Sequence, residues 1–193
     1  MNDFFSAIYT HLKIDYRKFY KMDALSKLGF LASEILLAGS DREKPKNETG
    51  IIFFNKSSSL EADINYQKTI QEKEHFFPSP SEFVHTLPNI VTGEIAIRHK
   101  IHGETAFYVM LDFRDEEMSC LINYAMRYGR MKCVLAGWVE VNVFKNDVNC
   151  FMMICTSKKA DERLSHLPVG LKQIQTGYNQ LFDEFTIDRL LNN

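Results

Sequence analysis

The sequence lacks the residue patterns that mark several large classes of protein. Its 193 residues include only four cysteines, and their spacing is not that of a metal site. The formal net charge is −2, so there is no basic excess of the kind that a nucleic-acid-binding protein needs. Residues 1–5 provide neither a basic start nor a long apolar stretch, which argues against a signal peptide or a membrane-spanning helix. We therefore expect a cytoplasmic protein that binds neither nucleic acid nor membrane.

What the sequence does contain is the composition of one globular domain. Apolar residues make up 45% of the chain and charged residues 25%, and this length is sufficient to bury a core. No internal repeat, linker or low-complexity tract divides residues 1–193, so we expect a single domain. The cysteines lie in apolar strand-like or helix-like runs, which predicts reduced core thiols and no metal site: Cys120, Cys133, Cys150 and Cys155.

Helix-like and strand-like segments alternate along the chain. Asp23 is the expected N-cap of an amphipathic helix over 23–37 that ends at Gly39, and the apolar run 51–54 predicts a strand buried on both faces. The other predicted elements are helices over 60–73, after the capping residue Ser81, and over 90–97; a strand over 105–111; a helix over 115–128 that ends at Gly129; strands over 132–141 and 148–155; and a terminal helix over 171–185. This order predicts a three-layer α/β/α domain whose mostly parallel sheet has one antiparallel edge strand.

Asp112 is the most informative residue, because it lies between a predicted strand and a predicted helix. Many α/β enzymes place a nucleophile at such a junction, where the helix N-terminus stabilises developing negative charge. A carboxylate stands here in place of a thiol or hydroxyl, and a carboxylate cannot form a stable thioester-type acyl-enzyme. Two interpretations remain open. Asp112 is either an N-cap or turn former, or a base in hydrolysis beside one of the six histidines, although no spacing brings a particular histidine to it.

Several further segments occur in an order that one family shares. They are the basic helix start 16–23, the proline-bracketed segment 77–80 leading into the Pro-Asn helix 88–96, Gly103 before a strand, Gly129 after a helix, and Leu135-Ala136-Gly137 followed by Glu140. Over residues 16–156 the chain resembles the N-terminal half of the β-ketoacyl-acyl-carrier-protein synthases, which have the thiolase fold. The resemblance implies a thiolase-like half-domain with a mostly parallel sheet.

The resemblance also implies that the catalytic equipment is missing. At the family's usual interval before Gly137, Asp112 occupies the position of the nucleophilic cysteine, and Phe113 and Arg114 replace the small residues that usually follow it. The two catalytic histidines of the family belong to its second half. The segment Phe4–Tyr9 matches the family's opening strand poorly, so we expect that strand to be missing or replaced.

Four residues are candidates for binding. In the resembled family, the strand matching 105–111 pairs with its twofold mate across a dimer, and the aromatic residues Phe107 and Tyr108 suit such a buried seam. Arg98 and Lys100, which alternate with His99 and His102, are candidates for contact with an acidic carrier protein. A solvated basic helix end is the alternative, whereas a metal site lacks an acidic or cysteine partner at a fitting interval. His75 and His85 are predicted to be surface loop residues.

The resemblance therefore implies a catalytically inactive ketosynthase-like protein similar to a chain-length factor. Such a protein would act as a scaffold or partner in fatty-acid, polyketide or aryl-polyene biosynthesis, as a homodimer or as a heterodimer with a full-length ketosynthase, and without a cofactor. Two alternatives remain open. The first is a small acyl-thioester hydrolase or decarboxylase that uses Asp112 with a histidine, and the second is a module that binds acyl-carrier protein without chemistry.

Overall fold

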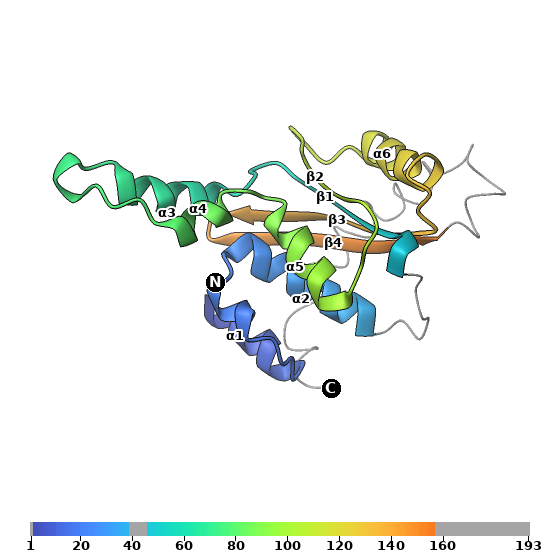
Figure 1. Ribbon diagram of the computed structural model, residues 1–193, viewed down its shortest axis with the longest axis horizontal. Helices are drawn as coiled ribbons and strands as arrows, with labels where there is room; N and C mark the ends of the chain where they lie inside the picture. The colour runs from blue at the N-terminus through green and yellow to red at the C-terminus, as the bar shows by residue number, and fades with distance from the viewer. Residues whose placement is uncertain (1, 39–45, 157–193) are drawn as a thin grey trace.

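The structure is a computed structural model that describes residues 2–38 and 46–156 (Figure 1). The helices and strands follow in this order: α1 (Asn2–His11), η1 (Arg17–Lys21), α2 (Ala24–Ala38), η2 (Lys46–Glu48), β1 (Thr49–Asn55), α3 (Leu60–Ile70), η3 (Lys73–His75), α4 (Pro80–His85), α5 (Ile90–His99), β2 (Thr105–Val109), α6 (Asp115–Arg127), β3 (Cys133–Asn142) and β4 (Asp147–Thr156). The predicted terminal helix 171–185 and Gly39 lie outside the described residues.

The sheet has four strands in the order β2-β1-β3-β4. Strand β1 pairs in parallel with both β2 and β3, and β4 pairs antiparallel with β3 through the turn after Asn142. Every residue of β1 is buried, as its continuous apolar run predicted for a strand covered on both faces. The mostly parallel sheet with one antiparallel edge strand is thus confirmed.

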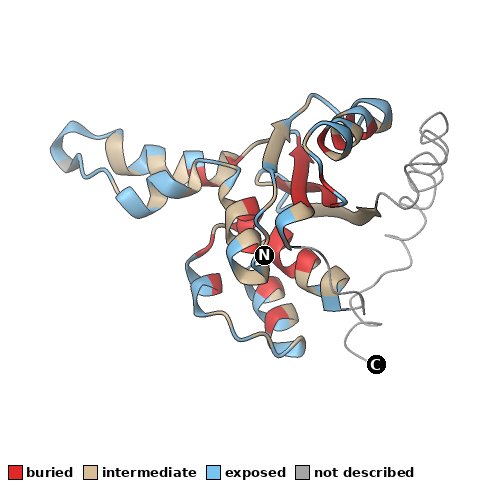
Figure 2. Ribbon diagram, turned by 45° about the vertical axis from the view of Figure 1, so that its right-hand side comes forward, coloured by how far each residue is buried: buried red, intermediate tan, exposed pale blue. Residues whose placement is uncertain are grey.

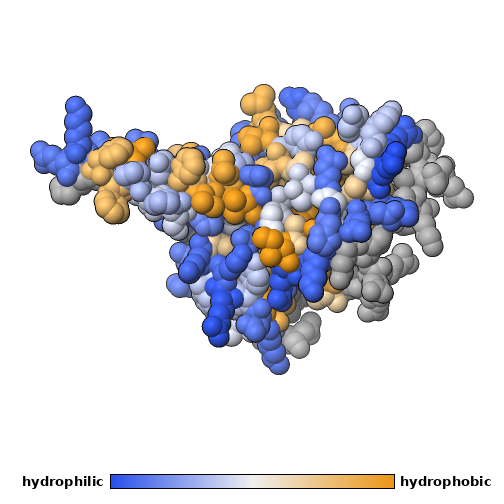
Figure 3. Space-filling view, viewed as in Figure 1, coloured by the Kyte–Doolittle hydropathy of each residue, from blue (hydrophilic) through white to orange (hydrophobic). Residues whose placement is uncertain are grey.

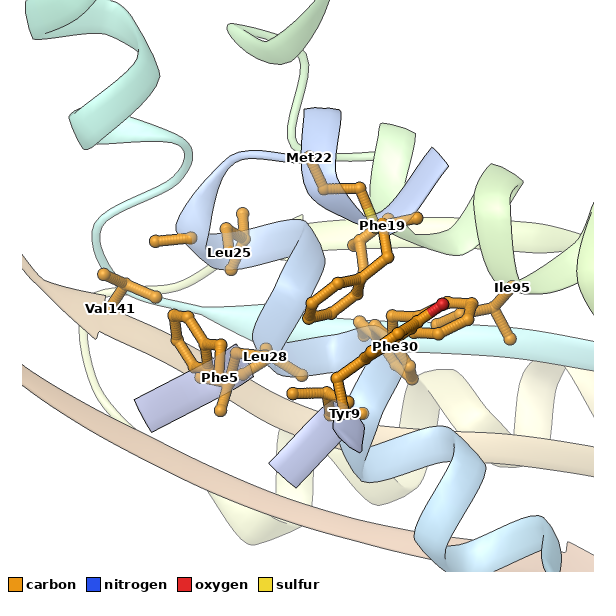
Figure 4. Close-up of a cluster of buried hydrophobic side chains, with 14 of the residues drawn as sticks. Phe5, Tyr9, Phe19, Met22, Leu25, Leu28, Phe30, Ile95 and Val141 are labelled. Atoms are coloured by element: carbon orange, nitrogen blue, oxygen red, sulfur yellow. The ribbon is translucent and has the colours of Figure 1, made fainter. Parts of the chain in front are cut away.

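Helices cover both faces of this sheet and complete the three layers (Figures 1 and 2). On one face α1, α2 and α5 enclose a core cluster to which Phe53 and Leu135 contribute from the strands. Figure 4 shows the aromatic centre of this cluster, where Tyr9 stacks on Phe19 at 4.3 Å between ring centroids. On the other face α6 packs over Ile52 and Val134. Successive residues of each strand therefore serve different clusters, because strand side chains alternate between the faces.

The N-terminal segment shows what stands in place of the family's opening strand. Phe4–Tyr9 lies within helix α1, and Phe5 and Tyr9 pack into the core cluster of the α2 face. Within the described ranges no strand precedes Thr49. The expectation that the opening strand is missing or replaced is borne out there, because a helix occupies the matching sequence.

Helices α3 and α4 form an arm, residues 60–87, that projects from the body beyond the strand ends (Figure 1). The N-cap of α4 is Ser79, whose Oγ accepts from the backbone N–H of Glu82, and Pro80 takes the first helical position. The prediction that Ser81 caps this helix was wrong, because proline's fixed φ favours the first helical turn and moves the cap one residue ahead of it. The prediction of Asp23 as a cap is supported by its Oδ1, which accepts from Ser26 N at 3.3 Å.

Candidate functional site

The carboxyl ends of three parallel strands meet at one edge of the sheet, which is where open α/β sheets bind ligands. This carboxyl edge is formed by residues 55–59 after β1, residues 110–114 after β2, and Glu140 near the end of β3. The arm leaves the body at the same edge, since α3 follows the β1 turn directly. The carboxyl edge is therefore the candidate functional site.

The turn after β1 is fixed by two side chains. Asn55 is fully buried, and its side-chain amide makes two hydrogen bonds to Ser58. Its Nδ2 donates to the Ser58 carbonyl at 2.8 Å, and its Oδ1 accepts from Ser58 N at 3.0 Å. Glu140 reaches across from β3, and its Oε2 accepts from the backbone N–H groups of Lys56 at 2.7 Å and Ser57 at 3.3 Å. Ser58 has a φ of 53°, a left-handed conformation that these bonds hold in place. Glu140 is thus a positioning residue for the turn that carries Lys56.

Asp112 lies at the predicted strand-to-helix junction, between the end of β2 and the start of α6. Its Oδ1 is 3.2 Å from Lys56 Nζ, and the two side chains are 70% and 59% exposed. An exposed pair of this kind contributes at most about 1 kcal/mol, because solvent screens it. The N-cap of α6 is Arg114, so the interpretation of Asp112 as the helix cap was wrong, and the turn interpretation fits its position.

The histidines that the structure describes in ion pairs are engaged elsewhere. His85 Nδ1 is 3.3 Å from Asp23 Oδ1, and His99 Nε2 is 2.6 Å from Glu34 Oε1. The pairing of Asp112 with Lys56 offers electrostatic balance but no group that would relay a proton as an imidazole does. These two ion pairs place His85 and His99 beside other carboxylates than Asp112, and the carboxyl edge carries an exposed carboxylate and a turn fixed by hydrogen bonds.

The four predicted binding residues are divided among three places. Phe107 packs toward the cluster of the α2 face, whereas Tyr108 stacks on Phe54 on the α6 face at 5.5 Å between centroids. Arg98 bonds Glu34 and donates to the Asp15 carbonyl at 3.1 Å. Lys100 is the exposed C-cap of α5 with a φ of 55°. The two aromatic residues share β2, and the two cations share the end of α5.

Glu34, which the sequence did not single out, contacts the predicted binding residue Arg98 and its neighbour His99. Burial favours its neutral form, yet hydrogen bonds and charge from His99 and Arg98 prevail and hold the pKa of Glu34 below its usual value. The prediction of a solvated end for His99 is corrected by this contact, since about three quarters of its side chain is covered. No local pattern could have paired positions 34 and 99, because only the packing of α2 against α5 brings them together.

A second missed cluster joins the arm to the body. Asp23, which precedes α2, faces His85 from α4 and Glu61 from α3. The hydrogen bond to Asp23 raises the pKa of His85 against the effect of burial, and burial together with the charge of Asp23 raises the pKa of Glu61. Only 17% of the His85 side chain is exposed, so the prediction of a surface loop residue was wrong: α4 presses it against the start of α2.

The cysteines follow the prediction in three of four cases. Cys133 is buried, and burial raises the pKa of Cys150 to about 12 and that of Cys155 to about 11, which keeps both as thiols. Cys120 is exposed, contrary to the prediction of a core thiol, because it lies on the side of α6 turned away from the sheet. Within residues 2–38 and 46–156 there is no group of three metal-ligating side chains. In the same ranges no helix has the length and apolar character needed to cross a bilayer.

Comparison with known proteins gives a fold likeness. No family model matches the sequence, and no curated protein matches it. The solved structure of the ishigamide ketosynthase/chain length factor is similar with a TM-score of 0.59 and 22% identity, over 74% of this chain and 46% of that one. The complex of the ketosynthase ApeO with its chain length factor ApeC from Xenorhabdus doucetiae is similar with a TM-score of 0.51 and 14% identity, over 66% of this chain and 50% of that one. This chain spans about half the length of those structures and has a thiolase-like α/β fold.

Proposed function

We propose that this chain is a non-catalytic, ketosynthase-like subunit that pairs through the open edge of β2 with a thiolase-like partner. The partner is a second copy or a full-length ketosynthase, and the pathway is one of fatty-acid, polyketide or aryl-polyene assembly. The observation that carries the proposal is the edge itself: β2 is the outermost strand, and among the described residues no strand pairs with its outer side.

An open strand edge is a template for pairing, and proteins that do not use one protect it with charges, prolines or bulges. Strand β2 has none of these, since residues 105–111 are uncharged and contain no proline. Exposed apolar side chains lie on β2 and beside it: Val109 in the strand, Leu111 after it, and Ile97 of α5, a helix that contacts β2. Figure 3 shows apolar side chains exposed on the face in view.

The proposed absence of acyl chemistry is supported by the residues at the carboxyl edge. The residue at the nucleophile position of the resembled family is an exposed aspartate paired with Lys56, and such a carboxylate cannot hold an acyl group as a thioester. Without covalent chemistry, binding to a partner is the role that the fold can still perform. The two similar solved structures are a ketosynthase/chain length factor and a ketosynthase in complex with its chain length factor, which supports a paired state for this chain.

Co-purification tests the pairing. The tagged chain is co-expressed with a full-length ketosynthase, and the retained protein is identified by mass spectrometry. Val109→Pro should abolish retention of the ketosynthase and self-association alike, because proline removes a donor from the outer side of the edge. Asp112→Asn is the matched control and should leave both unchanged. Loss of pairing in the control, or full pairing in the proline variant, contradicts the proposal.

Intact-mass measurement tests the absence of chemistry. After incubation with an acyl thioester, the Cys120→Ser variant, which lacks the exposed thiol, should gain no acyl mass, and adding Asp112→Asn should leave any background thioester hydrolysis unaltered. An acyl adduct on the Cys120→Ser variant, or hydrolysis that Asp112→Asn removes, would contradict the proposed absence of chemistry.

A further inference from the structure

The arm is held together by contacts of its own. Helix α3 packs chiefly against α4, where Tyr66 and Phe83 lie with ring centroids 5.4 Å apart. At the base of the arm the Ser59 hydroxyl donates to the Thr86 carbonyl at 2.6 Å, which joins the chain where it enters the arm to the chain where it leaves. The two helices can therefore move together relative to the body, with hinges at these two connections (Figure 1).

Apolar burial does little to hold the arm against the body. Ala62 is the one buried residue of α3, and no residue of α4 is buried. Among apolar side chains alanine removes the least area from water, so its hydrophobic contribution is the smallest. Polar contacts at the base of the arm therefore decide how firmly the arm is docked on the body.

The polar contacts between the arm and the body centre on His85. Its Nδ1 is 3.3 Å from Asp23 Oδ1, and its ring also forms a hydrogen bond with the Lys21 backbone carbonyl. Lys21 ends η1 and Asp23 precedes α2, so both acceptors belong to the body. An imidazolium ring has two N–H donors, whereas a neutral ring has one. The docked position of the arm therefore favours protonated His85.

Carboxylates of the body and of the arm lie beside this contact. Burial raises the pKa of Glu61 on α3, and the charge of Asp23 raises it further, while Lys27 of α2 acts in the opposite sense. Glu82 on α4 adds a charge that favours protonation of His85. The Oε2 atom of Glu61 is buried and has no hydrogen-bond partner among the described residues. Loss of the proton from His85 therefore leaves carboxylates of the arm and the body facing each other with less compensating charge.

We propose that the arm is docked on the body when His85 is protonated and swings open when His85 is neutral, so that pH sets the position of the arm. The pKa of His85 is raised in the docked arm, chiefly by its hydrogen bond to Asp23, so opening begins as pH rises above the usual 6.5. This movement goes beyond the pairing through β2 and does not depend on it.

Distance measurements between two spin labels test the movement on the full chain. One label is attached to the exposed thiol of Cys120 on α6, and the other to Gln71→Cys at the exposed end of α3. Electron paramagnetic resonance should give one narrow distance at pH 6. At pH 9 a second, broad population should appear, larger by roughly fivefold or more, which corresponds to the loss of one hydrogen bond. The same narrow distribution at both pH values overturns the proposal.

Two histidine variants locate the response. His85→Asn does not titrate in this range, so its distance distribution should be the same at pH 6 and pH 9. His99→Asn is the matched control, because His99 also contacts a carboxylate, that of Glu34, but lies on α5 and not in the arm. It should respond as the wild type does. A response that persists in His85→Asn, or that disappears in His99→Asn, overturns the assignment to His85.

The fluorescence of Trp138 separates movement of the arm from unfolding of the core. Trp138 is the single tryptophan of the chain and is 7% exposed in the cluster of the α6 face. Its emission should stay constant from pH 6 to pH 9 while the label distance changes. A shift of the emission together with the distance would mean that the core unfolds with the arm, which overturns a hinged movement.

Discussion

The two faces of the sheet are covered by different amounts of protein. On one face, α1, α2 and α5 leave Phe30, Phe53 and Val91 with no exposed surface. On the other, α6 is the helix that packs over the strands: Met118 and Val134 are fully buried beneath it, while Tyr124 and Tyr128 on its flank remain 63% and 70% exposed. On a face covered by several helices, the helices also pack against one another, whereas on a face with one helix the packing depends on that helix alone. The contrast separates positions where packing is rigid from positions where the structure can adjust.

The largest effect is expected at Phe53, which lies under the three-helix face. Phe53→Ala should lower the free energy of unfolding by about 4 kcal/mol, because several helices anchor the cavity walls and prevent their collapse. Met118→Ala under α6 should cost only about 2 kcal/mol, at the low end for such a change, because a single helix can shift inward. Urea denaturation of both variants measures the difference. Equal losses would mean that the two faces are equally rigid.

The next largest effects on stability are expected at two glycines, where substitution by alanine should have opposite signs. A Cβ at Gly29 would lie 2.5 Å from Val91 Cγ2 and 3.3 Å from the Phe53 ring, so Gly29→Ala should destabilise the protein by roughly 1–2 kcal/mol. At Gly93 on α5 nothing lies within 4 Å of the same atom. Gly93→Ala should therefore stabilise by up to about 1 kcal/mol, since alanine favours the helix. Thermal unfolding of the two variants provides the measurement, and stabilisation by Gly29→Ala would contradict the close packing.

The stability of the protein is expected to depend on pH through the contact between the arm and the start of α2. The pKa of His85 is raised above its usual 6.5, chiefly by its hydrogen bond to Asp23. The stabilisation from this contact is fully present below about pH 6.5 and is lost as pH rises through the raised pKa of the folded protein. His85→Asn keeps a donor near Asp23 but does not titrate in this range.

The excess stability of wild type over His85→Asn should therefore fall between pH 6 and pH 9 by on the order of 1 kcal/mol. Glu61, Lys27 and Glu82 also face this cluster, and they remain in both proteins, so the difference isolates the histidine. Urea denaturation at each pH measures this difference. A difference that is constant over the range would show that folding does not raise the pKa of His85.

Local rules predicted the elements well and the contacts between them poorly. The apolar run of β1, the cap at Asp23 and the acidic start of α6 each follow from neighbouring residues. Gly129 marked the end of α6 correctly, but the left-handed residue there is Arg130, with a φ of 57°. The other contacts depend on tertiary packing: the Glu34 contacts, the burial of His85 and the bond from Glu140 to the β1 turn join positions 62 to 84 residues apart. Glu140 had a sequence signal only through its place in the family motif.

The smallest effect is expected on the exposed flank of α6. Tyr124 and Tyr128 contact each other with ring centroids 4.8 Å apart, but both are mostly in solvent. Tyr124→Ala should change the free energy of unfolding by no more than about 0.5 kcal/mol, because little surface is removed from water there on folding. Tyr9→Ala is the matched change on the other face, where the ring is buried on Phe19, and it should cost about 3 kcal/mol or more. A loss above 1 kcal/mol at Tyr124 would mean that the α6 flank is packed in solution, and the contrast between the faces would then be smaller than the exposed fractions indicate.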